Sequence, residues 1–300
     1  MWIWLGLISM LFLGLYDISK KHALRNNAVL PVLFFSNLAG MLLVLPMLLL
    51  SAHMPETMAK WGLLVESFSW GGHGLIFGKA MIVSTSWVLG YFAMKHLPIS
   101  IVSPSRASGP VWTLIGAILL FHESPSPLQW LGMGIIFVSY FAFSFVGQHE
   151  GIHFSRSKWI LFIFLATVIG SGSALYDKWL IQRQGFAPMQ VLLWYLLYMM
   201  VILSFYTGIL WWPQRKKSTP FTWRWSIPLI GILLFIADLA YFFALSNPVT
   251  LIIVLSILRR CSVLVSFLAG AILFKEVNKR KKAWVLLGIL IGTFLIILAR

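Results

Sequence analysis

The chain has 300 residues, of which 60% are hydrophobic and only 10% are charged, and its mean hydropathy is +0.89. Because soluble domains contain about 25% charged residues, this composition excludes an ordinary soluble enzyme or nucleic-acid-binding domain. It predicts an integral membrane protein. The net charge of +15 is explained by membrane topology, since most basic residues lie between apolar runs.

Ten apolar runs have the length needed to cross a bilayer, which is roughly 17 to 25 residues. They cover residues 2–19, 31–50, 74–95, 98–120, 129–147, 159–180, 188–212, 226–246, 249–273 and 283–299. The predicted fold class is therefore an all-α membrane protein with ten transmembrane helices. We assign residues 1–147 to a first half, 148–158 to a connecting loop and 159–300 to a second half, with five helices in each half.

The two halves repeat one order of residues. Tyr91-Phe92, Pro98, Arg106 and Leu120-Phe121-His122-Glu123 recur as Tyr241-Phe242, Pro248, Arg259 and Leu273-Phe274-Lys275-Glu276, and Leu15-Tyr16-Asp17 recurs as Leu175-Tyr176-Asp177. An odd number of spans in each half requires the second copy to enter the membrane upside down. The halves are therefore predicted to be inverted repeats, an arrangement typical of transporters.

Part of this pattern resembles a known family. Ala93-Met94-Lys95, followed by Pro110-Val111-Trp112-Thr113, Glu123 and Gly132, is similar to the EamA repeat of the drug/metabolite transporter (DMT) superfamily. The resemblance extends over both halves, although the second half has Val263 where the proline is expected. It implies two five-helix EamA-type repeats.

Basic residues between the runs predict the orientation in the membrane. Fifteen lie in the odd-numbered loops, and five, including Lys79 and Lys178, lie on the other side. Since basic loops stay in the cytoplasm, this bias predicts that both termini are outside. The family resemblance implies the opposite, with both termini in the cytoplasm.

Three arginines lie inside the apolar runs. Placing an arginine at the centre of a bilayer costs about 2.5 to 3.5 kcal/mol even on the lenient insertion scale, so these side chains require partners. A guanidinium matches carboxylate or phosphate oxygens, and arginines from both repeats are expected to share one cavity. The predicted substrate-binding residues are Arg106, Arg259, Arg260, Ser105, Ser256, Tyr91 and Tyr241.

The alternative to an anion site is that three aspartates neutralise the three arginines. The solute would then meet a polar, neutral pocket. Asp238 lies deep in its run and is a candidate for ion coupling or for holding Arg259 or Arg260. Asp17 and Asp177 are expected to be interfacial partners of Lys20 and Lys178, with proton coupling as the other option. Glu123 is expected to close a helical hairpin.

The sequence therefore predicts a secondary active transporter, and not an enzyme, in the cell membrane. It would move a small anionic or zwitterionic metabolite, such as an amino acid or organic acid, by alternating access. Its expected partners are this solute and the lipid bilayer, without nucleic acid, metal or cofactor, and the expected state is a monomer, with a homodimer as the alternative. The competing functions are a lipid-modifying enzyme or lipid flippase, and an exporter of hydrophobic or cationic drugs.

Overall fold

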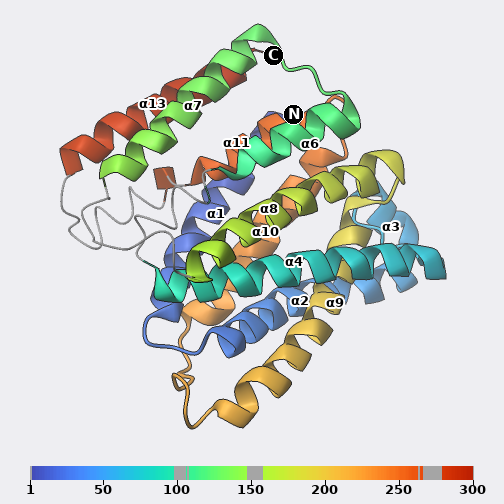
Figure 1. The fold of residues 1–300 in the computed structure, drawn as a ribbon. Coiled ribbons are helices and arrows are strands. Elements are labelled where there is room, and N and C mark those ends of the chain that lie inside the picture. The colour runs from blue at the N-terminus through green and yellow to red at the C-terminus, as the bar shows by residue number, and fades with distance from the viewer. Residues whose placement is uncertain are drawn as a thin grey trace.

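The structure is a computed structural model, and it describes residues 2–97, 106, 108–146, 158–262, 264–265 and 279–299. Every regular element in these ranges is a helix, which confirms the all-α prediction for them (Figure 1). The α-helices are α1 (Trp2–Leu24), α2 (Val29–His53), α3 (Pro55–Lys60), α4 (Trp70–His96), α6 (Gly109–Phe121), α7 (Pro127–Val146), α8 (Lys158–Lys178), α9 (Pro188–Tyr206), α10 (Ser226–Leu245), α11 (Ile252–Arg260) and α13 (Lys279–Leu298). The π-helical turns η1 (Trp179–Arg183) and η2 (Thr207–Trp211) extend α8 and α9, and the 3-10 turn η3 (Trp212–Gln214) follows η2.

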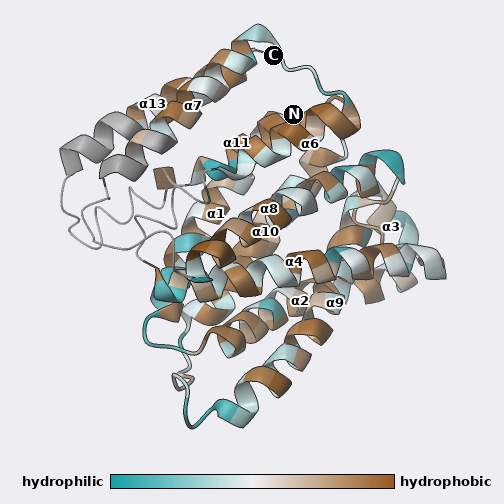
Figure 2. Cartoon of the chain, in the orientation of Figure 1, coloured by the Kyte–Doolittle hydropathy of each residue, from teal (hydrophilic) through white to brown (hydrophobic). Residues whose placement is uncertain are grey.

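Among the described residues, six segments are long and apolar enough to cross a membrane, which identifies a multi-pass integral membrane protein. They are α1, α2, α4, α8 with η1, α9 with η2 and η3, and α10. Shorter apolar stretches lie in α6, α7 and α13. The runs predicted at 98–120 and 249–273 extend beyond the described residues, so the number of ten spans stays a prediction. Apolar residues lie along the helices and hydrophilic residues gather at their ends (Figure 2).

Local sequence sets several helix ends. The Ser69 hydroxyl accepts a hydrogen bond from the backbone N–H of Gly72 at 3.2 Å and thereby caps α4. Pro55 and Pro188 begin α3 and α9, where the missing N–H costs no hydrogen bond. Gly185 has a φ of +72° in the turn between η1 and α9, a conformation that favours glycine.

Helices from the two halves pack against each other throughout the bundle. In chain order, α1, α2, α4, α6 and α7 correspond to α8, α9, α10, α11 and α13. The principal contacts between the halves are α1 with α10, α4 with α8, α2 with α10, α4 with α9, α6 with α8, α1 with α11, α2 with α9, α6 with α11, and α7 with α13. Exchanging corresponding helices leaves this set unchanged. The first six contacts form three couples whose members replace each other, and the last three contacts map onto themselves.

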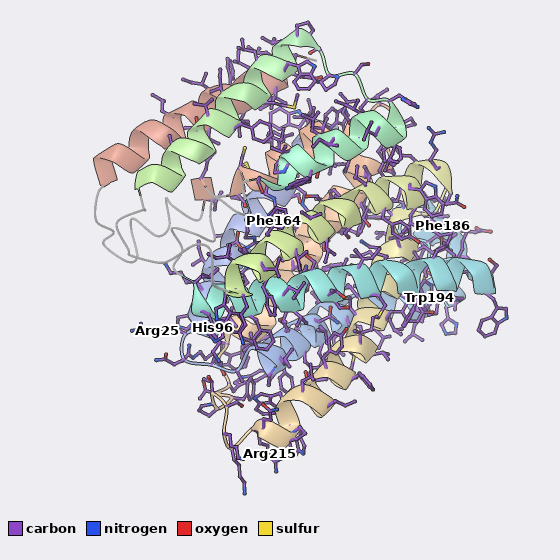
Figure 3. The ribbon with its side chains drawn as sticks, in the orientation of Figure 1. Arg25, His96, Phe164, Phe186, Trp194 and Arg215 are labelled. Atoms are coloured by element: carbon purple, nitrogen blue, oxygen red, sulfur yellow. The ribbon has the colours of Figure 1, made fainter. Side chains whose placement is uncertain are left out.

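The basic connections lie toward one end of the bundle. Arg224 Nη1 donates to the carbonyl of His22 at 2.6 Å, which joins the α9–α10 connection to the end of α1. Figure 3 shows Arg25 and Arg215 toward this end, whereas Phe186 lies toward the other end. The structure contains no membrane, so the orientation of this basic end stays a prediction.

Three lysines that the charge count assigned to loops are instead buried within helices. Lys20 in α1, Lys79 in α4 and Lys178 in α8 are only 4%, 3% and 7% exposed. The loop assignment was wrong because it did not follow the helices through these positions, although Lys79 and Lys178 fall inside the predicted runs 74–95 and 159–180. Their removal from the loop counts leaves the excess of basic residues on the same side.

Small residues bring α7 and α13 into backbone contact. A Cβ atom added to Gly132 would lie 2.7 Å from the carbonyl oxygen of Gly292, and one added to Gly292 would lie 2.6 Å from that of Gly132. Gly288 approaches Ser139 farther along the pair, so the two helices are antiparallel. Close approach at small residues is a main source of helix association in lipid, where hydrophobic burial contributes little.

Replacing Gly132 with alanine is therefore expected to lower the free energy of unfolding by about 1–3 kcal/mol, because the added methyl group meets backbone that cannot move aside. Gly134, two residues along α7, is the matched control, since a Cβ there meets nothing within 4 Å. Gly134→Ala should leave stability unchanged or raise it by up to about 1 kcal/mol. Thermal unfolding in detergent measures both, and equal midpoints would contradict the packing described.

Candidate functional site

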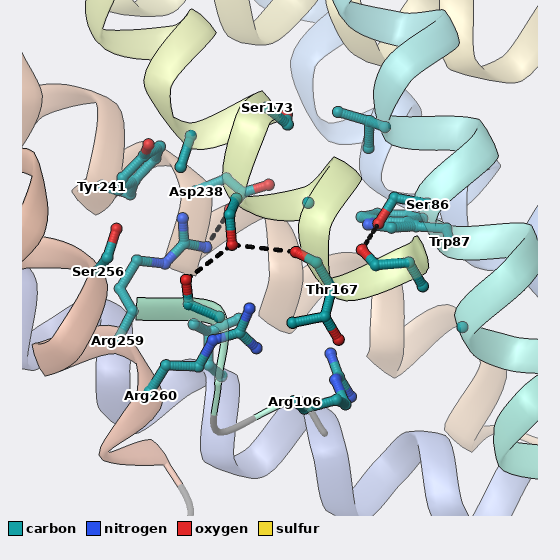
Figure 4. A pocket seen from close by; sticks show the side chains of 18 of the residues that line it. Ser86, Trp87, Arg106, Thr167, Ser173, Asp238, Tyr241, Ser256, Arg259 and Arg260 are labelled. Carbon is teal, nitrogen blue, oxygen red and sulfur yellow. Dashed lines mark hydrogen bonds and ion pairs between the residues drawn. The ribbon is translucent and has the colours of Figure 1, made fainter. Parts of the chain in front are cut away.

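A cavity of about 230 Å³ lies between the two halves of the chain (Figure 4). Its walls come from α1, α4, Arg106 and α6 of the first half, and from α8, α9, α10 and α11 of the second. Sites for drug-sized ligands usually measure about 300–1,000 Å³. The cavity is therefore of a size that fits a small metabolite.

The sequence-predicted site residues that the structure describes all line this cavity. They are Arg106, Arg259, Arg260, Ser256, Tyr91, Tyr241, Asp17, Asp177 and Asp238. Ser105 lies outside the described residues. Figure 4 shows the guanidinium groups of Arg259 and Arg260, at the end of α11, and that of Arg106, from the first half, directed into the same space. Their role in binding a substrate stays a prediction.

Arg259 has two contacts in the cavity wall. Its Nη2 forms an ion pair with Asp238 Oδ1 at 2.6 Å, and its guanidinium carbon lies 4.1 Å from the centre of the Tyr241 ring. The hydroxyl of Tyr195 donates to the other oxygen of Asp238 at 3.2 Å. The Arg259 and Asp238 side chains remain 19% and 12% exposed, so both are accessible from the cavity.

Asp177 is paired with Lys79, and not with Lys178 as the sequence analysis expected. Tyr241 donates its hydroxyl to the second oxygen of Asp177 at 3.3 Å. The expected pairing was wrong because Lys178, although adjacent in sequence, points around the helix toward Glu123. Lys79 was missed as a site residue, although its position within a predicted apolar run was a signal for it.

Asp17 and Lys20 form the third ion pair at the cavity, with an N–O distance of 2.7 Å. Beside them, the hydroxyls of Tyr16 and Tyr91 share a hydrogen bond of 2.8 Å. The Asp17 side chain is 34% exposed, so it is more open to the cavity than its repeat-related counterpart Asp177, which is 7% exposed.

Positive charge exceeds negative charge among the described residues that line the cavity. Lys79, Arg106, Arg259 and Arg260 are cationic, whereas the three aspartates are anionic. Each aspartate is in an ion pair, but lysines hold two of them, through Lys20 and Lys79, and only Asp238 is held by an arginine. The alternative in which three aspartates pair with three arginines is therefore not the arrangement found.

Arg106 and Arg260 have surroundings that differ from those of Arg259. Arg106 Nη1 lies 3.8 Å from the sulfur of Met94, a weak acceptor. The Arg260 guanidinium lies against Gly109, where an added Cβ would be 3.3 Å from Nη2.

Glu123 holds a second buried contact between the halves, at the end of the bundle opposite the basic connections. Its carboxylate pairs with Lys178 at 2.5 Å and accepts the backbone N–H groups of Ile252 and Ile253 at 2.8 and 3.3 Å. Lys178 also donates to the carbonyl of Thr250. Glu123 therefore caps the N-terminus of α11 in the other half, which is a favourable position for an anion. The sequence analysis predicted only that Glu123 closes a helical hairpin within its own half.

No group of three or more histidine, cysteine, aspartate or glutamate side chains in the described part of the chain could hold a metal ion. Two hydroxyls in the cavity wall are used within the bundle. Ser171 donates to the carbonyls of Gly109 and Thr167, and Ser86 donates to that of Ala166. The arrangement can therefore attract an anion through charge, with aromatic and hydroxyl groups at the walls.

Comparison with known proteins identifies a family for the first half. Residues 1–145 match the model of the EamA-like transporter family. No curated protein matches the chain. A solved structure described only as "Crystal structure of protein" has a TM-score of 0.75 and 13% sequence identity, and the match covers 100% of this chain and 97% of the other. It establishes a shared fold, while the EamA resemblance of the second half stays a prediction.

Lys178→Met should destabilise the protein by about 3–5 kcal/mol, because it leaves the buried Glu123 carboxylate without its counter-charge. Adding Glu123→Gln should recover part of this loss, since the amide oxygen can still accept from the start of α11 without a buried charge. Lys60→Met, at an exposed lysine, is the control. The measurement is thermal unfolding in detergent, and a single variant as stable as the control would refute this role for the pair.

Proposed function

Because residues 1–145 belong to the EamA-like transporter family of the DMT superfamily, we propose that this protein is a secondary active transporter of a small anionic or zwitterionic metabolite. The family and the six candidate spans indicate a multi-pass membrane transporter. The proposal also places the protein in the cell membrane and makes an amino acid or organic acid its solute.

The observation that carries the proposal is the excess of positive charge at a cavity between the halves. Arg106 from the first half and Arg259 and Arg260 from the second line the same space, and each aspartate there already has an ion-pair partner. A solute carboxylate can form paired hydrogen bonds with a guanidinium. Binding it would reduce the excess charge, whereas binding a cation would increase it.

Alternating access is supported by the symmetry of helix packing. The principal helix contacts are unchanged when corresponding helices of the two halves are exchanged, and α7 runs antiparallel to its counterpart α13. Both features fit two inverted five-helix repeats, which open a central site to either side by rocking against each other. One chain forms the whole cavity, which favours a monomer as the transporting unit.

The competing functions have less support from the cavity. An exporter of cationic drugs would be favoured by carboxylates outnumbering arginines, but the described lining has as many arginines as aspartates and Lys79 in addition. A lipid-modifying enzyme requires a nucleophile or a general base close to its partner. In the described lining, the aspartates are instead paired with cations.

Transport should fall by about tenfold or more in Arg106→Gln and in Arg259→Gln, because each change removes a positive charge from the cavity and the second also leaves Asp238 unpaired. The assay is uptake into liposomes of labelled succinate, citrate, glutamate and alanine, at matched protein content. Arg215→Gln, at an exposed residue between α9 and α10, is the control. Undiminished transport by both cavity variants would reject the anion site and leave the transporter fold intact.

A further inference from the structure

Six side chains in the cavity wall form a closed ring of contacts. In order around the ring they are Lys79, Asp177, Tyr241, Arg259, Asp238 and Tyr195. Two ion pairs, Lys79 with Asp177 and Arg259 with Asp238, lie on opposite sides of the ring. Two tyrosines join one pair to the other.

Each tyrosine contacts one ion pair through its hydroxyl and the other through its aromatic ring. Tyr241 donates its hydroxyl to Asp177 and holds Arg259 over its ring, at 3.3 and 4.1 Å. Tyr195 donates its hydroxyl to Asp238 and has Lys79 over its ring, at 3.2 and 4.7 Å. Because a tyrosine can bind a carboxylate and a cation at once, neither ion pair can change its geometry without affecting both links to the other.

Lys79 is the member of this ring that comes from the first half. It lies on α4, whereas the other members lie on α8, α9, α10 and α11. Its partner Asp177 is on α8, the helix against which α4 packs. The Lys79–Asp177 pair therefore connects the two halves along one of their principal contacts.

The two ion pairs differ in their access to a solute. Lys79 and Asp177 are 3% and 7% exposed, whereas Arg259 and Asp238 are 19% and 12% exposed. A solute in the cavity can therefore contact Arg259 more readily than Lys79, and the ring links the two cations.

We propose that Lys79 is a positioning residue that couples solute binding at Arg259 to the relative movement of the two halves. This rests on the proposed function, in which an anionic solute occupies the cavity. The anion competes with Asp238 and with the Tyr241 ring for the Arg259 guanidinium. Both links lead to Lys79, one through Asp177 and the other through Tyr195.

This coupling has a thermodynamic requirement. A ligand shifts the balance between two conformations only if it interacts differently with them. The ring satisfies this requirement if the Lys79–Asp177 contact differs between the two conformations, which differ in the relative position of the halves. A static role would not require the charges, since a buried ion pair can be replaced by apolar side chains with little loss of stability.

The decisive variant is Lys79→Met with Asp177→Leu, which removes both charges together and avoids leaving either one buried alone. The probe is the anion among succinate, citrate and glutamate that the parent protein transports fastest. We expect its dissociation constant, from thermal stabilisation in detergent, to stay within about threefold of the parent value. Its transport rate in liposomes should fall by about tenfold or more.

Tyr195→Phe is a second variant that removes a single oxygen and keeps the ring beneath Lys79. It should lower the transport rate by about threefold or more at nearly unchanged affinity. Tyr198→Phe is the matched control, because Tyr198 lies on the same helix with its hydroxyl on His73, outside the ring. Its rate should equal that of the parent.

The outcomes separate the two proposals. A double variant that binds and transports like the parent overturns the coupling role of Lys79 and leaves the proposed function intact. A double variant that loses affinity and rate together also overturns it, because Lys79 would then act in binding. A parent protein that neither binds nor transports succinate, citrate or glutamate overturns the coupling role, and one that also fails with alanine overturns the proposed function.

Discussion

The cost of removing charge from water is the constraint on which this structure depends. An unpaired ion in an apolar bundle is unstable, so the interior cations and carboxylates must be arranged together. The chain meets this requirement with pairs such as Lys79–Asp177, Lys178–Glu123 and Arg259–Asp238. The first two of these pairs join the two halves, so the same interactions that make interior charge tolerable also connect the repeats.

Much of the fold follows from patterns along the chain. Apolar runs and repeated residues predicted a helical membrane protein, and each predicted run contains a helix in the described structure. The arginines that line the cavity could also be identified, because a charge within an apolar run is conspicuous. Ser256 was associated with them because it flanks Arg259, and Tyr91 and Tyr241 through their positions in the repeats. All three line the same space.

The ion-pair partners of the buried charges could not be predicted from these patterns. Asp177 and Lys178 are adjacent, but neighbouring residues on a helix point in different directions, so each contacts a different part of the bundle. The contact of Lys79 with Asp177 joins residues 98 positions apart. The resemblance between the halves did not reveal it either, since Leu229 occupies the position in the second half that corresponds to Lys79.

The unequal exposure of Asp17 and Asp177 has a consequence for the proposed alternating access. These aspartates are counterparts in the two repeats, yet one is 34% and the other 7% exposed. If the two halves exchanged conformations, as inverted repeats can, Asp177 would become exposed to the cavity and Asp17 would become buried. A single set of atomic positions then describes both ends of the cycle, and the opposite-facing form can be built by giving each half the shape its counterpart has now.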